Sequence, residues 1–145
     1  MIPVKVKRLH PDAVLPTYAT DGSACFDIYA THDGVVTEGS SCTFSTGLAF
    51  EIPPGYVMEV YSRSGQAFNN DVRLGNAVGI IDSDFRGELK IKLTRDNPFG
   101  EYRHDKTKAV AQAMVVPVEK CSFTEVTELS STARGENGFG STDNS

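Results

Sequence analysis

The sequence is short of positive charge and of long apolar runs, and each shortage excludes a class of protein. The formal net charge is -5, whereas a protein that binds along a nucleic-acid backbone needs a positive surface to displace counterions. No apolar run is long enough to span a membrane, and the first residues do not resemble a signal peptide. We therefore expect a soluble, intracellular, cytoplasmic protein with neither nucleic acid nor a membrane as its partner.

Cysteine and histidine are also scarce. The three cysteines, Cys25, Cys42 and Cys121, are widely spaced, and none forms the Cys-x-x-Cys pair of a zinc site, so we expect reduced, structural thiols. The three histidines are equally scattered and give no support to a histidine-centred metal site or a Ser/His/Asp hydrolase. We expect these histidines to lie at the surface.

What is present is the pattern of one all-β domain. A chain of 145 residues is long enough for one hydrophobic core and short for two. Apolar and polar residues alternate over several short stretches separated by glycine and proline, which is typical of strands. The stretches that predict strands are 4–9, 23–30, 42–52, 56–61, 72–74, 109–116 and, as a short strand or cover, 123–129. Residues 102–108 predict a charged loop, and the alanines of 109–116 leave a helix open as the alternative there.

Residues 79–89 predict a β-hairpin that contains two carboxylates and one aromatic ring. The arms of such a hairpin could hold a flat guest, because backbone N–H and C=O groups would read its edge. Asp82 would stand beside the guest, and Asn76 could donate or accept at a base edge. A nucleobase is the candidate guest.

Residues 62–66 form a small-residue corner between a strand and the start of a predicted helix near Gln66, where Ser64 could cap the helix. Free N–H groups and Arg63 at such a corner would converge on an anion such as phosphate. A capped surface turn with a solvated arginine is the more common explanation of this pattern. Asp27 lies in an otherwise apolar strand, which fits either a binding site or a hydrogen-bonded turn.

The C-terminal residues 130–145 have the composition of a disordered segment, and disorder is the default interpretation. They nevertheless contain a cation, Arg134, and one ring, Phe139, between two glycines. A tail that folds over a nucleotide would use these parts, with the ring on the base and with amides and the arginine on the phosphates.

Five stretches in order resemble the motifs of the all-β homotrimeric dUTPase family, and they span most of the chain. The motifs are matched by residues 23–30, 62–66, 76–89, 110–114 and 134–142. The resemblance implies a distorted jelly roll, a homotrimer with active sites between subunits, and a C-terminal arm exchanged between subunits. It divides the chain into a β domain, residues 1–129, and a flexible arm, residues 130–145, that closes over the site.

The resemblance also implies residue roles. Asp82 matches the catalytic aspartate that orients and deprotonates the attacking water, and Asp27 matches the aspartate that holds, through water, the Mg²⁺ bound to the triphosphate. The remaining positions imply substrate contacts: Arg63, Ser64, Gly65 and Gln112 on phosphates; Asn76, Gly79, Ile80, Ile81, Phe85 and Lys90 on uracil and deoxyribose; and Arg134, Phe139, Gly140, Ser141 and Thr142 in the closing arm. Asp84 and Arg86 belong to the third motif, and we expect a structural role for Asp84.

Three positions depart from the family pattern. Phe85 stands where the family commonly has tyrosine, so the ring remains without its hydroxyl. Residues 106–112 replace the usual Gly-Asp-Arg/Lys lead into the fourth motif, which affects the approach to Gln112. Asp143 replaces a usual glycine and adds negative charge near the phosphates.

The activity implied is hydrolysis of dUTP to dUMP and pyrophosphate with Mg²⁺. Two alternatives stay open on the sequence. One is a relative of the dCTP deaminases, which share the fold, and the other is a non-catalytic trimer that binds nucleotide or a regulatory protein partner.

Overall fold

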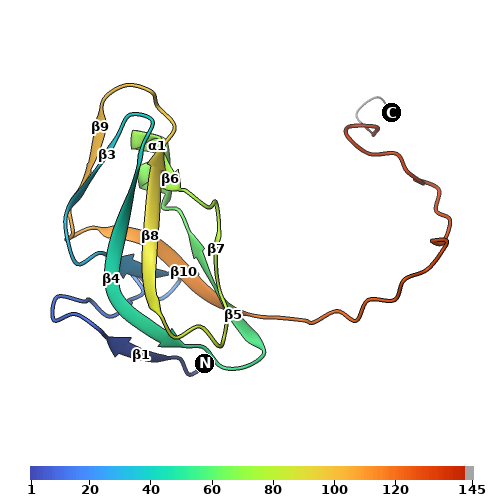
Figure 1. Ribbon diagram of the computed structural model, residues 1–145, viewed down its shortest axis with the longest axis horizontal. Helices are drawn as coiled ribbons and strands as arrows, with labels where there is room; N and C mark the ends of the chain where they lie inside the picture. Colours follow the sequence, from blue (N-terminus) through green and yellow to red (C-terminus); the bar gives the residue numbers. More distant parts are fainter. Residues whose placement is uncertain (143–145) are drawn as a thin grey trace.

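The structure, a computed structural model, describes residues 1–142 and is built almost entirely of antiparallel strands (Figure 1). The elements are β1 Lys5–Arg8, β2 Phe26–Tyr29, β3 Gly34–Thr37, β4 Ser41–Glu51, β5 Tyr56–Tyr61, α1 Ser64–Asn70, β6 Val72–Leu74, β7 Gly79–Ile81, β8 Glu88–Arg95, β9 Glu101–His104 and β10 Ala109–Pro117. One sheet has the order β1-β4-β8-β6, a second has the order β2-β10-β5-β7, and β3 pairs with β9 in a separate ribbon. The all-β prediction is confirmed.

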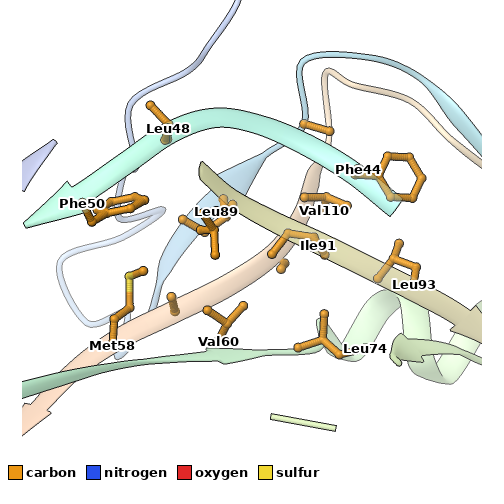
Figure 2. Packing of buried hydrophobic residues seen from close by; sticks show 14 of the residues in the cluster. Phe44, Leu48, Phe50, Met58, Val60, Leu74, Leu89, Ile91, Leu93 and Val110 are labelled. Carbon is orange, nitrogen blue, oxygen red and sulfur yellow. The ribbon is translucent and has the colours of Figure 1, made fainter. Parts of the chain in front are cut away.

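The core lies between the two four-stranded sheets (Figure 2). Ile91 of β8 lies opposite Val60 of β5 in this space, and Phe44, Leu48 and Met58 belong to the same buried cluster; each of the five is at most 2% exposed. Successive side chains of a strand point to opposite faces of its sheet. The alternation of apolar and polar residues in the sequence therefore reflects one face that packs in the core.

A bulge in β4 lets this strand serve two neighbours. Its register against β8 shifts between Ser45 and Ala49. Gly47 lies in the bulge with φ +66°, and a Cβ there would stand 2.8 Å from the Cβ of His10, so both backbone conformation and space require glycine. Beyond the bulge, Ala49 pairs with Glu88 of β8 on one edge and with Lys7 of β1 on the other.

Two sequence predictions in the core region are wrong. Residues 102–108 were expected to form a charged loop, but Tyr102 and His104 belong to β9, which pairs with β3. The histidines were expected at the surface, yet His104 is 2% exposed, and its ring packs edge-on against Phe44 with 5.0 Å between centroids. Charged neighbours on the outer side of β9 mask this alternation in the sequence.

After β10 the chain leaves the domain. Residues 118–142 contain no strand or helix, and Figure 1 shows them extending away from both sheets. The short strand predicted at 123–129 is therefore absent from the single chain. Phe123 and Leu129 are 93% and 89% exposed, because no strand edge of the same chain lies beside them.

The three cysteines are free thiols. Across the described residues, no helix has both the length and the apolar character to traverse a lipid bilayer.

Burial lowers the pKa of His104, although the nearby carboxylates of Asp105 and Asp33 act in the opposite direction. The unfolded chain takes up this proton near pH 6.5, whereas the folded chain does so only at lower pH. The free energy of unfolding should therefore fall as the pH drops through 6.5, by about 1.4 kcal/mol for each unit by which the folded pKa is depressed.

Thermal unfolding between pH 7.5 and 5 tests this. We expect the melting temperature of the wild type to decrease towards low pH and that of His104→Gln to be lower at neutral pH but less dependent on pH. His10→Gln removes an exposed imidazole and should keep the wild-type slope. An equal slope in His104→Gln and the wild type would contradict the assignment.

Candidate active site

A narrow slot lies between β7 and β8, where the two sheets do not join. β7 is the edge of its sheet and pairs only with β5, and β6 covers β8 only over residues 93–95. The cavity between the strands has a volume of about 80 Å³ and is lined by Val60, Leu74, Asn76, Gly79, Ile80, Ile81, Leu89, Lys90, Ile91 and Lys92. Five predicted uracil contacts, Asn76, Gly79, Ile80, Ile81 and Lys90, therefore come together.

The pairing within this stretch differs from the expected hairpin. The two arms belong to different sheets and form no ladder with each other. This leaves the facing edges of β7 and β8 available to a guest, which a hydrogen-bonded hairpin would not do. Sequence alternation identifies the arms but cannot reveal which strands they pair with.

Gly79 lies close to Val60 at the slot. A Cβ on Gly79 would lie 3.0 Å from the Cβ of Val60, its partner in the β5–β7 ladder, so a larger residue would crowd the Val60 side chain. The amide nitrogen of Asn76 lies 3.8 Å from the same Cβ position, which puts the amide beside β7. Lys92 packs its aliphatic stem against Gly75 and was missed as a lining residue, since its alternation with Ile91 indicated only a solvent-facing lysine.

The turn after β7 carries Asp82 and Phe85, and both are exposed. The Phe85 N–H donates to the Asp82 carbonyl at 3.2 Å, and the Arg86 guanidinium donates to the carbonyls of Ser83 and Phe85. Within residues 1–142, the Asp82 carboxylate has neither a hydrogen bond nor an ion pair. It is therefore an unengaged base at the mouth of the slot.

The Phe85 ring lies over Gly87. A Cβ on Gly87 would stand 2.6 Å from the ring. The ring is thereby held in the turn, and the side chain is still 44% exposed. Asp84 is exposed and points to no partner among the described residues.

A second group of predicted residues meets at the end of β5. Arg63 Nη1 lies 3.0 Å from Asp27 Oδ1, which joins the first and second motifs through an ion pair. Gln112 stands opposite Asp27 in the β2–β10 ladder, and its amide donates to the Ser62 carbonyl at 2.9 Å. We call residues 62–65 the phosphate corner.

The helix after the corner is present, but it is not capped as expected. α1 begins at Ser64, its N-cap residue is Arg63, and no side chain caps it. Ser64 and Gly65 are exposed, and nothing lies within 4 Å of a Cβ at Gly65, so the backbone there is open to a ligand. Ser62 was not predicted as a contact; its hydroxyl accepts from the Leu74 N–H at 2.9 Å and fixes the corner to β6.

Asp82 and Arg63 lie far apart within one chain. Asp82 follows Ile81, which pairs with Met58, whereas Arg63 lies five positions further along the chain from Met58. At about 3.3 Å per extended residue, the separation along the strand is on the order of 16 Å. One chain therefore does not place its Asp82 next to its own Arg63.

The tail residues are further still from the slot of their own chain (Figure 1). Arg134 donates to the Asn137 carbonyl at 2.8 Å in a local turn, and Phe139 has φ 52° and a fully exposed ring. Gly140, Ser141 and Thr142 continue this turn region. Asp143 lies outside the described residues.

No group of three or more histidine, cysteine, aspartate or glutamate side chains suited to a metal ion occurs within residues 1–142. Asp27 offers one carboxylate, whose side chain is 15% exposed and is shared with Arg63. A single carboxylate suits contact with a hydrated ion carried by a ligand better than an all-protein metal cage. Nearby, burial and then the charge of Asp27 raise the pKa of the Cys25 thiol, so it stays protonated.

Comparison with known proteins gives one family. The dUTPase family model matches residues 12–143. The deoxyuridine 5'-triphosphate nucleotidohydrolase of Helicobacter hepaticus is 44% identical over 140 residues, 95% of this chain and 87% of its own. That of Anaplasma marginale is 43% identical over 98% of this chain and 99% of its own.

Solved structures agree. The Staphylococcus bacteriophage 80alpha dUTPase with dUpNHpp matches with a TM-score of 0.87 at 27% identity, over 96% of this chain and 97% of that one. The G164S mutant of the same phage enzyme with dUpNHpp gives a TM-score of 0.88 at 26% identity. The fold is thus the jelly-roll type of these enzymes, and the chain belongs to the dUTPase family.

Proposed function

We propose that the protein hydrolyses dUTP to dUMP and pyrophosphate. The observation that carries the proposal is the slot between the unpaired edges of β7 and β8, with the unengaged carboxylate of Asp82 at its mouth. Relatives that are 44% and 43% identical carry the name of this activity. The reaction keeps uracil out of DNA and supplies dUMP for thymidylate synthesis.

Selection of the base rests on the slot. Backbone groups of residues 79–81 and of the strand near Lys90 hydrogen-bond the edge of uracil, with Asn76 beside them. A pattern of donors and acceptors that fits uracil leaves groups unpaired with cytosine, which rejects it by about 10⁴-fold. The Phe85 ring packs on deoxyribose and leaves no room for a 2′-hydroxyl.

Asp82 performs the chemistry. Its carboxylate takes a proton from a water molecule as the water oxygen bonds to the α-phosphorus, and the bond from this phosphorus to the pyrophosphate oxygen breaks. Arg63 and the N–H groups of Ser64 and Gly65 bind the phosphates, and Gln112 holds this corner in place. No covalent enzyme intermediate is needed.

The arm completes the enclosure. Phe139 stacks on the uracil, and Arg134 with Gly140, Ser141 and Thr142 binds the phosphates. Residues 130–145 thus act as a flexible closing segment attached to the β domain.

Mg²⁺ is the proposed cofactor. The single half-buried carboxylate of Asp27 fits a hydrated ion that arrives on the triphosphate, and it would hold that ion through water. When bound, the ion neutralises charge on the phosphates. Asp27 and Arg63 form an ion pair in the free chain, which keeps both groups oriented towards the same point.

The active assembly is proposed to be a homotrimer. The separation of Asp82 from Arg63 and the direction of the tail both support sites assembled from several copies. An apolar groove of about 580 Å³, lined mostly by the N-terminal segment with Phe26, Phe50 and Val115, remains open in the single chain. The exposed apolar residues of 118–129 from another copy suit this groove, which would exchange the arm between subunits.

Pyrophosphate release from dUTP, dTTP, dCTP and UTP tests the activity. We expect turnover of dUTP to exceed that of the other three by at least about 10²-fold, since each breaks one contact in the slot or at the sugar. Ammonia release from dCTP would instead identify a deaminase. Binding of dUTP without turnover would identify a non-catalytic or regulatory protein.

Asp82→Asn tests the general base. The amide cannot accept the proton, so we expect kcat for dUTP to fall by about 10³-fold or more while the affinity for a non-hydrolysable dUTP analogue changes little. Asp84→Asn removes a neighbouring carboxylate of the same turn and should retain most activity. Wild-type kcat in Asp82→Asn would refute the role of Asp82.

Deletion of residues 130–145 tests the arm. The β domain should still fold and assemble, as light scattering would show, while kcat/KM for dUTP falls by about 10²-fold. The sequence has no tryptophan, so Phe139→Trp provides a single reporter whose fluorescence should change when the analogue binds. Unchanged kinetics after deletion, together with no fluorescence change, would mean that the tail plays no part.

A further inference from the structure

Helix α1, which follows the phosphate corner, has little of its own to hold it in place. It has seven residues, no side-chain N-cap and no acidic residue in its first turn. A helix this short is marginal without tertiary contacts. Its large apolar residue, Phe68, is 89% exposed and adds nothing to the core.

The buried residue of this helix is a polar one, Gln66, at 8% exposure. Its Nε2 donates to the Ala109 carbonyl at 3.2 Å and to the Tyr102 hydroxyl at 3.3 Å. The Tyr102 oxygen in turn lies 3.4 Å from Nδ1 of the buried His104. Gln66 thus connects α1 to both β9 and β10.

The hydrogen bond from Gln66 to Ala109 is the second of two attachments between the phosphate corner and β10. Ala109 is the first residue of β10, and three residues later Gln112 donates back to the Ser62 carbonyl. Two glutamine amides therefore tie the corner to β10, Gln112 just before Arg63 and Gln66 just after Gly65. Two further contacts hold the corner: the Arg63–Asp27 ion pair and the hydrogen bond from the Leu74 N–H to the Ser62 hydroxyl.

Stability alone does not explain a glutamine at this position. Gln66 Oε1 is buried and, within the described residues, has no hydrogen-bond partner. A buried acceptor without a partner destabilises the fold, and an apolar side chain of the same shape avoids that cost. The amide of Gln66 instead fixes the position of α1, because its two hydrogen bonds join the first turn of this helix to β9 and β10.

We propose that Gln66 is a positioning residue for the reaction: through Ala109 and Tyr102 it sets the backbone of the phosphate corner at the place where the triphosphate binds. The inference rests on the proposed function. It assigns Gln66 to recognition of the phosphates and not of the base, because the slot between β7 and β8 shares no residue with this network.

Gln66→Met keeps the length of the side chain and removes both donors. We expect the affinity for α,β-imido-dUTP and the kcat/KM for dUTP to fall about tenfold, the scale of two lost hydrogen bonds. The affinity for deoxyuridine, which lacks phosphates, should stay within about twofold. Isothermal titration gives the first affinity, and NMR titration gives the second.

Two further variants make the result specific. Asn69→Ala alters an exposed residue of the same helix and should leave both affinities unchanged. Tyr102→Phe removes one of the two acceptors and should weaken the analogue several-fold with deoxyuridine again unaffected. This variant decides the matter if Gln66→Met does not fold.

An equal loss for both ligands in Gln66→Met would overturn the proposal, as would an unchanged affinity for the analogue in Gln66→Met or in Tyr102→Phe. These outcomes differ from a failure of the proposed function. A wild type that does not hydrolyse dUTP contradicts the function, whereas an active wild type with normal analogue binding in both variants contradicts only the role of Gln66.

Discussion

The site depends on a strand pairing that is not made. β7 and β8 face each other at the point where two four-stranded sheets meet, yet neither completes a ladder there. Unpaired backbone groups on a strand edge destabilise the fold when they are buried, and they pair readily with other chains when they are exposed. On the proposed function, the edge of the ligand takes the place of the missing strand, and backbone groups of β7, which pairs with β5 through Gly79 and Val60, bind the base. The groups proposed to bind the base are then part of the fold itself.

Local pattern predicts the strands well and their partners poorly. The alternation in residues 56–61 corresponds to β5, and residues 109–116, assigned as a strand from the all-β context, correspond to β10. The same kind of pattern suggested a hairpin at 79–89, where the arms lie in different sheets. Pairing depends on contacts between residues far apart in sequence, such as Gly79 with Val60, and no period of two contains that information.

The polar interior was the least predictable part. Gln66, Tyr102 and His104 form one network, but Tyr102 and His104 stand among charged residues in the sequence and indicated a loop. Their meaning comes only from β9 pairing with β3, which turns one face of that strand inward. By contrast, Asp27 and Arg63 were identified from their local sequence and Gln112 from the family resemblance, and the structure brings the three together. The sequence can therefore indicate the residues of a site, whereas the residues that hold them in place are identified only from their contacts in the structure.

The same geometry couples catalysis to assembly. The Asp82 turn and the phosphate corner lie at opposite ends of β5, and the tail carries its arginine and its exposed ring away from both. On the proposed assignment, a nucleotide in the slot of one chain meets the Asp82 carboxylate of that chain but neither its phosphate corner nor its Phe139 ring. In the proposed trimer each copy supplies the slot for one substrate, and the corner and arm for others. Because the apolar residues at 118–129 and the open N-terminal groove are exposed in the single chain, burying them on assembly supplies hydrophobic free energy that holds these distant parts together. On this proposal, folding of one chain forms the slot with Asp82 beside it, and association adds the phosphate corner and the closing arm.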